Sequence, residues 1–312
     1  MNKQVDQFVQ EQLNEWPLAG KNFAALAGIQ TKEVKVNGVN YRVQFNPARI
    51  VSSGAKVDKK SIQERKCFLC SENRPAEQRG IPYKQYTVLL NPFPIFPKHL
   101  TIPDTSHVDQ LIDNRVEDML ALAEQLDEYV LFYNGPKCGA SAPDHMHFQA
   151  GNKGFLPLET EIHTFERTTI TQEGTAKLAL LEDEPRNGLL IQGEQIKDLV
   201  TLFEKVYQLL PVQEGEAEPM LNLLAWKEEN QWYLLLLLRK KHRPSCYFAE
   251  GEDKLLSSPA SVDLGGVFIT PIASDFERMD SNKIQEIIKE VSLSKQEILT
   301  LLKPIQDEST PS

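Results

Sequence analysis

The segment GPKCGASAPDHMHFQAG, residues 135–151, holds two histidines that are one residue apart. The chain has only six histidines, and Gln149 follows His145 and His147 at the same spacing. In a β-strand, residues i and i+2 point to the same face. We therefore predict that these three side chains line one face of a strand and that the apolar residues between them line the other. Three polar groups on one face indicate a site, and the alternative is an exposed strand edge with ordinary surface residues.

The same segment contains the groups that transfer of a nucleotidyl group through histidine requires. A neutral imidazole can attack phosphorus and hold the nucleotidyl group as a phosphoramidate, which divides one difficult transfer into two easier steps. The ring needs a partner that fixes its tautomer, and the phosphate needs donors. Gln149 can donate from its amide. Ser141 and the backbone N–H groups of Gly139 and Ala140 can form an anion-binding concavity. Asp144 either orients a histidine or caps the turn.

A second motif, CFLC, indicates a metal site. Cys67 and Cys70 place two thiolates at the spacing of half a tetrahedral zinc site. Two more ligands must come from elsewhere, and the candidates are His99, His107 and His145. The alternative is a pair of reduced cysteines without metal. A thioredoxin-like redox role fits less well, because a polar segment follows the motif where a helix is expected.

Composition limits the classes of partner. The chain has 312 residues and a formal net charge of −10, which argues against nucleic-acid binding, where a basic surface is expected. The N-terminal segment is polar and lacks the apolar stretch of a signal peptide. The longest apolar run, Tyr233–Leu238, is too short to span a bilayer. We expect a soluble, cytoplasmic protein that binds neither nucleic acid nor membrane.

The elements of the first half follow from periodicity and turn residues. Asn37-Gly38 between alternating segments is a strong hairpin signal. The expected elements are a helix over 3–16, a hairpin over 33–47, a mobile loop over 51–66, two strands within 86–103 that prolines interrupt, a helix over 108–130, and strands over 130–134 and from residue 145.

The second half has a similar rhythm, which predicts an α+β fold with an antiparallel sheet. The expected elements are a helix over 195–210, a hairpin over 219–244, a strand over 265–271, and two closing helices over 281–291 and 294–303. Ser294 and Glu297 form a capping box for the last helix, and Pro304 is expected to end it. We divide the chain into halves at 1–160 and 161–306, with a disordered tail at 307–312.

A longer pattern, N-x(4)-GAS-x-P-x-HxHxQ, resembles the active-site segment of the transferase branch of the histidine-triad superfamily. That branch contains galactose-1-phosphate uridylyltransferase, diadenosine tetraphosphate phosphorylase and GDP-L-galactose phosphorylase. HFQA looks most like the last of these, and GAS looks more like the diadenosine type. The resemblance covers about residues 41–160, and the matching residues are Asn134, Gly139, Ala140, Ser141, Pro143, His145, His147 and Gln149.

This resemblance implies a role for each matching residue. His147 would be the nucleophile and Gln149 its phosphate partner, with Ser141 beside them. The zinc ligands would be Cys67, Cys70, His107 and His145. The implied fold is two similar halves that form a large antiparallel sheet flanked by helices, and only the first half carries the motif. Glutamine at the third position of the triad favours transfer or phosphorolysis over hydrolysis.

Other polar residues are candidates for substrate binding. Arg239 and Lys241 belong to a basic cluster after an apolar strand, which is either a clamp for phosphates or a solvated strand end. Asn91 can face the base or the ribose, or pack. Arg49 and Lys98 are further phosphate candidates. His99 and His163 are interpreted as structural.

These observations together predict a nucleotidyltransferase or phosphorylase with a covalent nucleotidyl-histidine intermediate. Its substrate would be a nucleoside-diphosphate sugar or a dinucleoside polyphosphate, and its acceptor phosphate or a sugar phosphate. Zn²⁺ would be structural, and Mg²⁺ can assist by neutralising charge, although no carboxylate cluster requires it. The alternatives are a hydrolase of the same superfamily and a non-catalytic nucleotide-binding protein.

Overall fold

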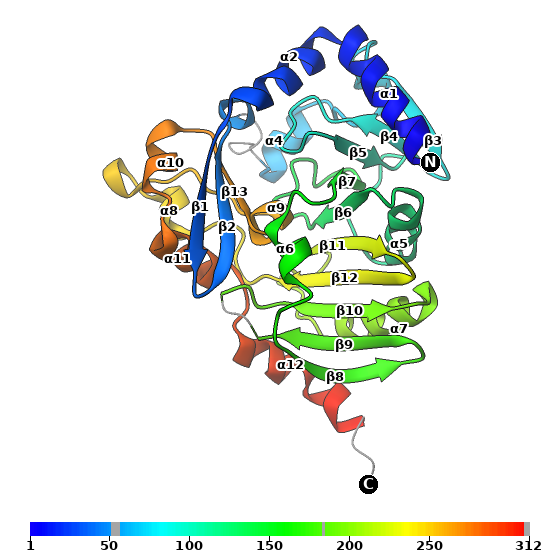
Figure 1. Ribbon diagram of the computed structural model, residues 1–312, viewed down its shortest axis with the longest axis vertical. Coiled ribbons are helices and arrows are strands. Elements are labelled where there is room, and N and C mark those ends of the chain that lie inside the picture. Colours follow the sequence, from blue (N-terminus) through cyan, green and yellow to red (C-terminus); the bar gives the residue numbers. More distant parts are fainter. Residues whose placement is uncertain (51–56, 183–184, 309–312) are drawn as a thin grey trace.

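Ten strands form one continuous antiparallel sheet in this computed structural model, which describes residues 1–50, 57–182 and 185–308 (Figure 1). From one edge to the other the strands are β3 (Gly80–Tyr83), β4 (Tyr86–Leu90), β5 (His99–Pro103), β7 (His147–Asn152), β6 (Tyr129–Asn134), β11 (Leu221–Glu228), β12 (Gln231–Leu238), β10 (Leu189–Gly193), β9 (Ala176–Leu181) and β8 (Arg167–Glu173).

The order of the strands is symmetric about the pair β6–β11. The first half runs β3, β4, β5, α5 (Val116–Gln125), β6 and β7, and the second runs β8, β9, β10, α7 (Ile196–Tyr207), β11 and β12. Both halves therefore have the same connectivity, and they meet where Asn134 pairs with Asn222. The prediction of an α+β fold with two similar halves in one large antiparallel sheet is confirmed. The predicted division at residue 160 falls within α6 (Pro157–Glu161).

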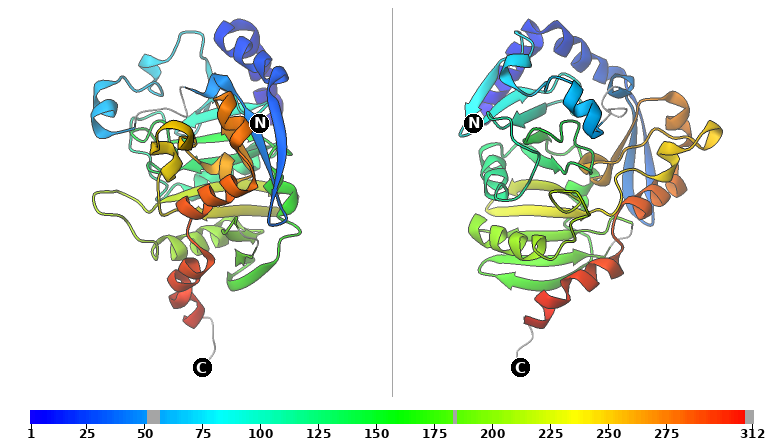
Figure 2. Two further views of the ribbon diagram at one scale, coloured as in Figure 1. Left: turned by 90° about the vertical axis from the view of Figure 1, so that its left-hand side faces the viewer. Right: turned by 180° about the vertical axis from the view of Figure 1, so that it is seen from behind.

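Each face of the large sheet packs against a different layer. One face forms a core with α1 (Asn2–Glu15), α2 (Pro17–Ala25), α5, α7 and α12 (Lys295–Glu308). The other face packs against a three-stranded sheet of β1 (Gln30–Val36), β2 (Val39–Phe45) and β13 (Val267–Thr270), and against α9 (Ser261–Leu264), α10 (Ala273–Arg278) and α11 (Ser281–Val291). Figure 2 shows α7 and the β1–β2 hairpin on opposite sides of the large sheet.

Several predicted elements are confirmed by the structure. The β1–β2 hairpin turns at Asn37 and Gly38, whose φ angles of 49° and 92° match the positive φ that a two-residue hairpin turn requires. The prolines interrupt the sheet between β4 and β5. Ser294 and Glu297 form the predicted capping box, since each accepts a hydrogen bond from the backbone N–H of the other.

The helix predicted over 108–130 is shorter than expected. It begins at Val116, because the preceding segment bonds to the loop that carries the histidines. The N–H of Met146 donates to the carbonyl of Val108 at 2.7 Å, and the N–H of Gln110 donates to the carbonyl of Pro143 at 3.3 Å. The residues just before α5 are therefore part of the framework of the site.

Two predictions about chain ends and loops are wrong within the described residues. Pro304 lies inside α12, which continues to Glu308, so residues 307 and 308 are helical. A proline inside a helix costs about 3 kcal/mol, and burial of Ile298, Leu302 and Ile305 offsets it at about 1.5–3 kcal/mol each. Part of the predicted mobile loop is the helix α4 (Lys59–Glu64), capped by Asp58; residues 51–56 and 309–312 lie outside the described residues.

The sequence predictions did not include the helices α2, α6, α9 and α10 or the strands β3, β8, β9 and β10. The other short elements in the described parts of the chain are α8 (Ser245–Phe248) and 3₁₀ turns at Leu26–Gly28, Pro47–Arg49, Ser71–Asn73 and Gly251–Asp253. Among the described residues, no helix combines the length and the apolar character that crossing a bilayer requires.

Candidate active site and metal centre

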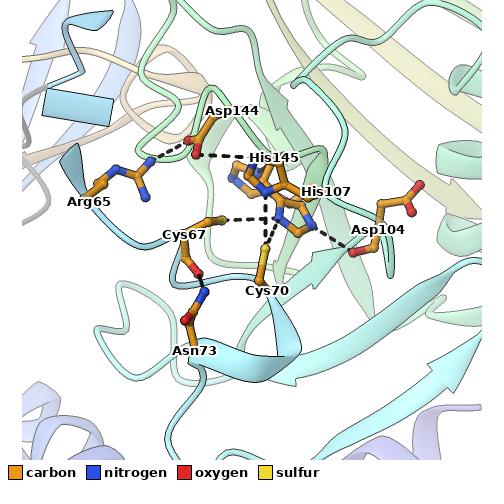
Figure 3. Close-up of polar contacts among 9 residues, drawn as sticks. Arg65, Cys67, Cys70, Asn73, Asp104, His107, Asp144 and His145 are labelled. Carbon is orange, nitrogen blue, oxygen red and sulfur yellow. Dashed lines mark hydrogen bonds and ion pairs between the residues drawn. The ribbon is translucent and has the colours of Figure 1, made fainter. Parts of the chain in front are cut away.

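Two cysteines and two histidines from three separate segments converge on one point (Figure 3). The ligand atoms of Cys67, Cys70, His107 and His145 all lie within 4.8 Å of one another. Nδ1 of His145 is 3.3 Å from Sγ of Cys67 and 3.6 Å from Sγ of Cys70, and Nδ1 of His107 is 3.2 Å from Sγ of Cys70. Around a tetrahedral zinc ion, sulfur and nitrogen ligands are about 3.6 Å apart. The donor set therefore fits Zn²⁺.

Neighbouring groups orient these ligands, as expected of a metal site. Nε2 of His145 lies 2.9 Å from the carbonyl oxygen of Asp104 and must donate to it, so Nδ1 is the nitrogen that faces the two thiols. Asp144 forms an ion pair with Arg65 at 2.5 Å, and its other oxygen is 4.0 Å from Nε2 of His107. Burial opposes ionisation of Cys67, but the hydrogen bond with His145 and two backbone N–H groups lower its pKa to about 6. This thiol is thus prepared to bind a cation as thiolate.

His147 is the first residue of β7 and is buried. Its Nδ1 lies 2.8 Å from the carbonyl oxygen of His145, so Nδ1 carries the hydrogen and Nε2 keeps its lone pair. In the described chain, no group hydrogen-bonds to Nε2. Burial is the largest effect that lowers the pKa of His147 to about 4. The imidazole is therefore neutral near pH 7, as a nucleophile must be.

Gln149 lies on the same strand face as His147, and His99 and Asn91 fix its side chain. Nδ1 of His99 accepts from the N–H of Ile95 at 3.1 Å, so Nε2 carries the hydrogen and donates to Oε1 of Gln149 at 3.0 Å. Asn91 also reaches that oxygen, at 3.4 Å. Burial lowers the pKa of His99 to about 3, which keeps this ring neutral. The oxygen end of the amide is thus held by the protein, and its NH₂ end is available as a donor.

The prediction that His145 shares this strand face is wrong. His145 lies in the turn before β7, and its ring faces the cysteines. The expected separation of faces holds for the strand itself, because Met146 and Phe148 belong to the core on the helical side of the sheet.

Residues of the C-terminal half support the turn that carries Gly139, Ala140 and Ser141. Nδ2 of Asn222 donates to Oδ1 of Asn134 and to the carbonyl of Cys138, both at 2.7 Å. Gly139 has a φ of +98°, and a Cβ there would lie 2.6 Å from Cβ of Ala260. The turn therefore requires glycine for its backbone conformation and for its close contact with the second half.

The structure places Arg239 behind this turn. Its buried guanidinium donates five hydrogen bonds, to Oδ1 of Asn222 and to the carbonyls of Pro259, Lys241, His242 and Val291. The donors expected to clamp a phosphate are thus occupied by protein acceptors.

The other candidate cations lie in different surroundings. Lys241 forms an ion pair with Glu290 on α11. Arg49 donates to the carbonyl of Phe93 at 2.6 Å, and burial lowers its pKa to about 10. Lys98 pairs with Asp6 on α1. The structure brings none of these three amine or guanidinium groups into hydrogen-bond contact with His147 or Gln149.

Sequence reasoning did not identify Gln110 and Asn222, and it interpreted His99 as a candidate metal ligand or a structural residue rather than as the residue that orients Gln149. Asn222 is a single polar residue in an apolar segment, and Gln110 lies beside Asp109 in a mixed segment, so neither residue carries a spacing signal of its own. His99 lies in the segment that follows the proline-rich break, and that position was the one available signal for its role.

Comparisons with known proteins cover nearly the whole chain. A domain family of unknown function, DUF4922, matches residues 8–152, and the family described as GDPGP1-like, C-terminal domain, matches residues 160–308. No curated protein matches the chain significantly in sequence.

The structure is similar to crystal structures of yeast Ap4A phosphorylase Apa2. One has a TM-score of 0.58 at 16% identity and covers 89% of this chain and 97% of that chain. The complex with AMP has a TM-score of 0.53 at 16% identity, covering 90% and 96%, and the complex with Ap4A has a TM-score of 0.53 at 15% identity, covering 90% and 97%. At such identities the likeness shows the fold. This fold and the GDPGP1-like C-terminal half support the resemblance to the transferase branch of the histidine-triad superfamily.

Proposed function

We propose that the chain is a nucleotidyltransferase or phosphorylase that forms a covalent nucleotidyl-histidine intermediate at His147. The observation that carries this proposal is the 2.8 Å hydrogen bond from Nδ1 to the carbonyl of His145. It directs the hydrogen to Nδ1 and leaves a neutral nitrogen with a free lone pair. A nitrogen in this state is the nucleophile that attack on phosphorus requires.

The proposed reaction has two displacement steps. In the first, the lone pair of Nε2 attacks the α-phosphorus of the substrate, a P–N bond forms, and the P–O bond to the leaving group breaks with its electron pair on oxygen. The proton stays on Nδ1, and the carbonyl of His145 stabilises the positive charge that the ring acquires. In the second step, an oxygen of phosphate or of a sugar phosphate attacks the same phosphorus. The P–N bond then breaks, and the ring returns to its neutral state.

The phosphate oxygens would be held by donors on the same segment as the nucleophile. The NH₂ of Gln149 is two residues from His147, and its oxygen end is fixed by His99. Ser141 and the backbone N–H groups of Gly139 and Ala140 lie on the turn before β7 and would complete the set.

Fewer of the predicted residues are available to contact the rest of the substrate than the sequence suggested. Nδ2 of Asn134 has no protein partner in the described chain, so this residue can still donate to substrate. Asn91 uses both ends of its amide, toward Phe93, Thr101 and Gln149, so its role is to orient Gln149. Arg239 and Lys241 act outside the proposed substrate contacts.

We propose a nucleoside-diphosphate sugar or a dinucleoside polyphosphate as the substrate, with phosphate or a sugar phosphate as the acceptor. The fold is that of the yeast Ap4A phosphorylase, which has been crystallised with AMP and with Ap4A. The GDPGP1-like C-terminal half supports a nucleotide substrate as well. Glutamine at the third triad position favours transfer to phosphate over hydrolysis.

We also propose that Cys67, Cys70, His107 and His145 hold one structural Zn²⁺. Four protein donors leave no position for substrate, so the ion would supply folding free energy by joining distant segments. The carbonyl of His145 is the hydrogen-bond partner of His147, so this centre would also hold the group that orients the nucleophile. Mg²⁺ from solution can neutralise charge on the substrate phosphates, and the cluster of metal-binding residues found among the described residues is the Cys/His group alone.

The test is the intact-protein mass after mixing with diadenosine tetraphosphate and with UDP-, GDP- and ADP-sugars. The wild type should gain the mass of one nucleotidyl group, which is a nucleoside monophosphate less water and identifies the base, and His147→Ala should gain none. Product formation that depends on added phosphate separates the phosphorylase from a hydrolase. Binding of these nucleotides without any adduct would contradict the proposed intermediate.

A further inference from the structure

Strands β6 and β7 separate from each other at His147. Their registered pairs run from Tyr129↔Asn152 to Phe132↔Gln149 and end there. Both strands nevertheless continue, because Asn134 of β6 still pairs with Asn222 of β11, and His147 of β7 still pairs with Pro103 of β5. In the same register Tyr133 would face Phe148 and Asn134 would face His147, but the ladder between the two strands ends before these pairs.

The side-chain amide of Gln110 fills this interruption. Its Oε1 accepts from the backbone N–H of His147 at 2.7 Å. Its Nε2 donates to the carbonyl of His147 and to the carbonyl of Asn134, both at 3.0 Å. One amide thus satisfies both backbone groups of His147 and one of Asn134, which would otherwise be buried without partners.

Gln110 is itself held rigidly. The residue is completely buried, its backbone N–H donates to the carbonyl of Pro143, and its carbonyl accepts from the hydroxyl of Tyr133 at 3.1 Å. Every polar group of Gln110 therefore has a partner, and its position is fixed on the segment between β5 and α5 as well as on β6. A side chain with this many fixed contacts sets the position of the backbone that it touches.

We propose that Gln110 is a positioning residue for the nucleophile: its amide holds β6 and β7 apart at His147 and fixes the backbone from which the imidazole projects. This inference rests on the proposed function, because it concerns the placement of the attacking nitrogen. Gln110 acts through the backbone of His147 and touches neither the ring nor the phosphate donors. Displacement of a nucleophile by about 1 Å can reduce a rate by about 100-fold, so loss of this amide acts on the chemical step.

The chain offers a matched control. Gln12 on α1 is also completely buried, and its amide also bridges backbone groups: it donates to the carbonyl of Glu77 and accepts from the N–H of Arg79, both at 3.0 Å. Gln12→Met and Gln110→Met therefore each remove a buried amide that bridges backbone groups. The amide of Gln110 contacts His147, and the amide of Gln12 is remote from it.

The experiment measures the single-turnover rate of adduct formation with diadenosine tetraphosphate and a GDP-hexose, and the dissociation constant of each nucleotide. Gln110→Met should lower the rate by about 100-fold with the dissociation constant unchanged, and Gln12→Met should leave both at their wild-type values. Gln110→Glu keeps the acceptor for the N–H of His147 but loses both donated bonds, so it should show the same loss of rate in a folded protein.

A rate for the folded Gln110 variants within threefold of Gln12→Met would overturn the positioning role while leaving the proposed intermediate in place. Equal losses of rate and binding would also overturn it, because they would indicate a purely structural residue. If the wild type forms no adduct, the proposed function itself fails, and the role of Gln110 fails with it.

Discussion

Glu218 provides a pH-dependent test of how the two halves are joined. This buried carboxyl group lies in the segment before β11, accepts from the N–H of Ile112 at 2.9 Å, and contacts the hydroxyl of Tyr133 on β6 at 2.5 Å. Desolvation by burial raises its pKa from 4.5 to about 7, although these hydrogen bonds oppose the change. The C-terminal half therefore places an acid of unusual pKa against the framework that holds His147.

The sign of the effect follows from proton binding. Between pH 4.5 and 7 the folded protein binds a proton at Glu218 that the unfolded chain has released, so stability falls as the pH rises through this range. The difference in pKa corresponds to about 3 kcal/mol, most of which is lost between pH 4 and pH 8. Glu218→Gln should therefore match the wild type near pH 4.5 and exceed its free energy of unfolding by about 3 kcal/mol at pH 8.

The assay is urea unfolding monitored by tryptophan fluorescence at pH 4.5, 6.5 and 8. Glu297→Gln is the control, because hydrogen bonds from Ser294 lower the pKa of Glu297 and its contribution has the opposite sign. A difference between Glu218→Gln and the wild type that is constant with pH would refute the reasoning. So would a variant that is less stable than the wild type at pH 8.

Three further predictions concern the metal centre and the turn. Cys67→Ser should lose the bound zinc, measured by plasma mass spectrometry, and unfold at a lower temperature; retention of a full equivalent of zinc would contradict the ligand set. Gly139→Ala should destabilise the protein by about 1–3 kcal/mol and slow adduct formation, because φ is +98° and Ala260 leaves no room; wild-type values in both assays would show that the turn can adapt. Arg239→Met should lower the free energy of unfolding in urea by about 3 kcal/mol or more, since five acceptors lose their donor. Arg239→Lys should not restore the lost stability, because an ammonium lacks the guanidinium fork. Full recovery by lysine would contradict this geometry.

The sequence predicted features that depend on local spacing. The pair Asn37-Gly38 specified a hairpin because few residues other than Asn and Gly adopt its positive φ angles. The spacing of His147 and Gln149 specified a shared strand face because side chains alternate along a strand. The resemblance in the HxHxQ segment extended these local inferences to a two-half sheet that periodicity alone did not specify.

The rest depended on contacts between distant segments. His107 became distinguishable from His99 as a metal ligand through the resemblance, and in the structure the segment before α5 brings it to Cys70. A basic cluster after an apolar strand looks the same in sequence whether its side chains face solvent or the interior, so the buried position of Arg239 could not be foreseen. Gln110 gives no signal at all, because its partners are backbone groups and leave no pattern of residue types.

The most direct test of the central claim is to locate the covalent adduct and to discharge it. The wild-type protein is mixed with the nucleotide that gives an adduct, digested, and analysed by fragmentation mass spectrometry; a second portion is freed of nucleotide and mixed with phosphate. The account predicts a nucleoside monophosphate on His147 and its release by phosphate as the nucleoside diphosphate. An adduct on any other residue, or an adduct on His147 that phosphate does not release while water does, would contradict it.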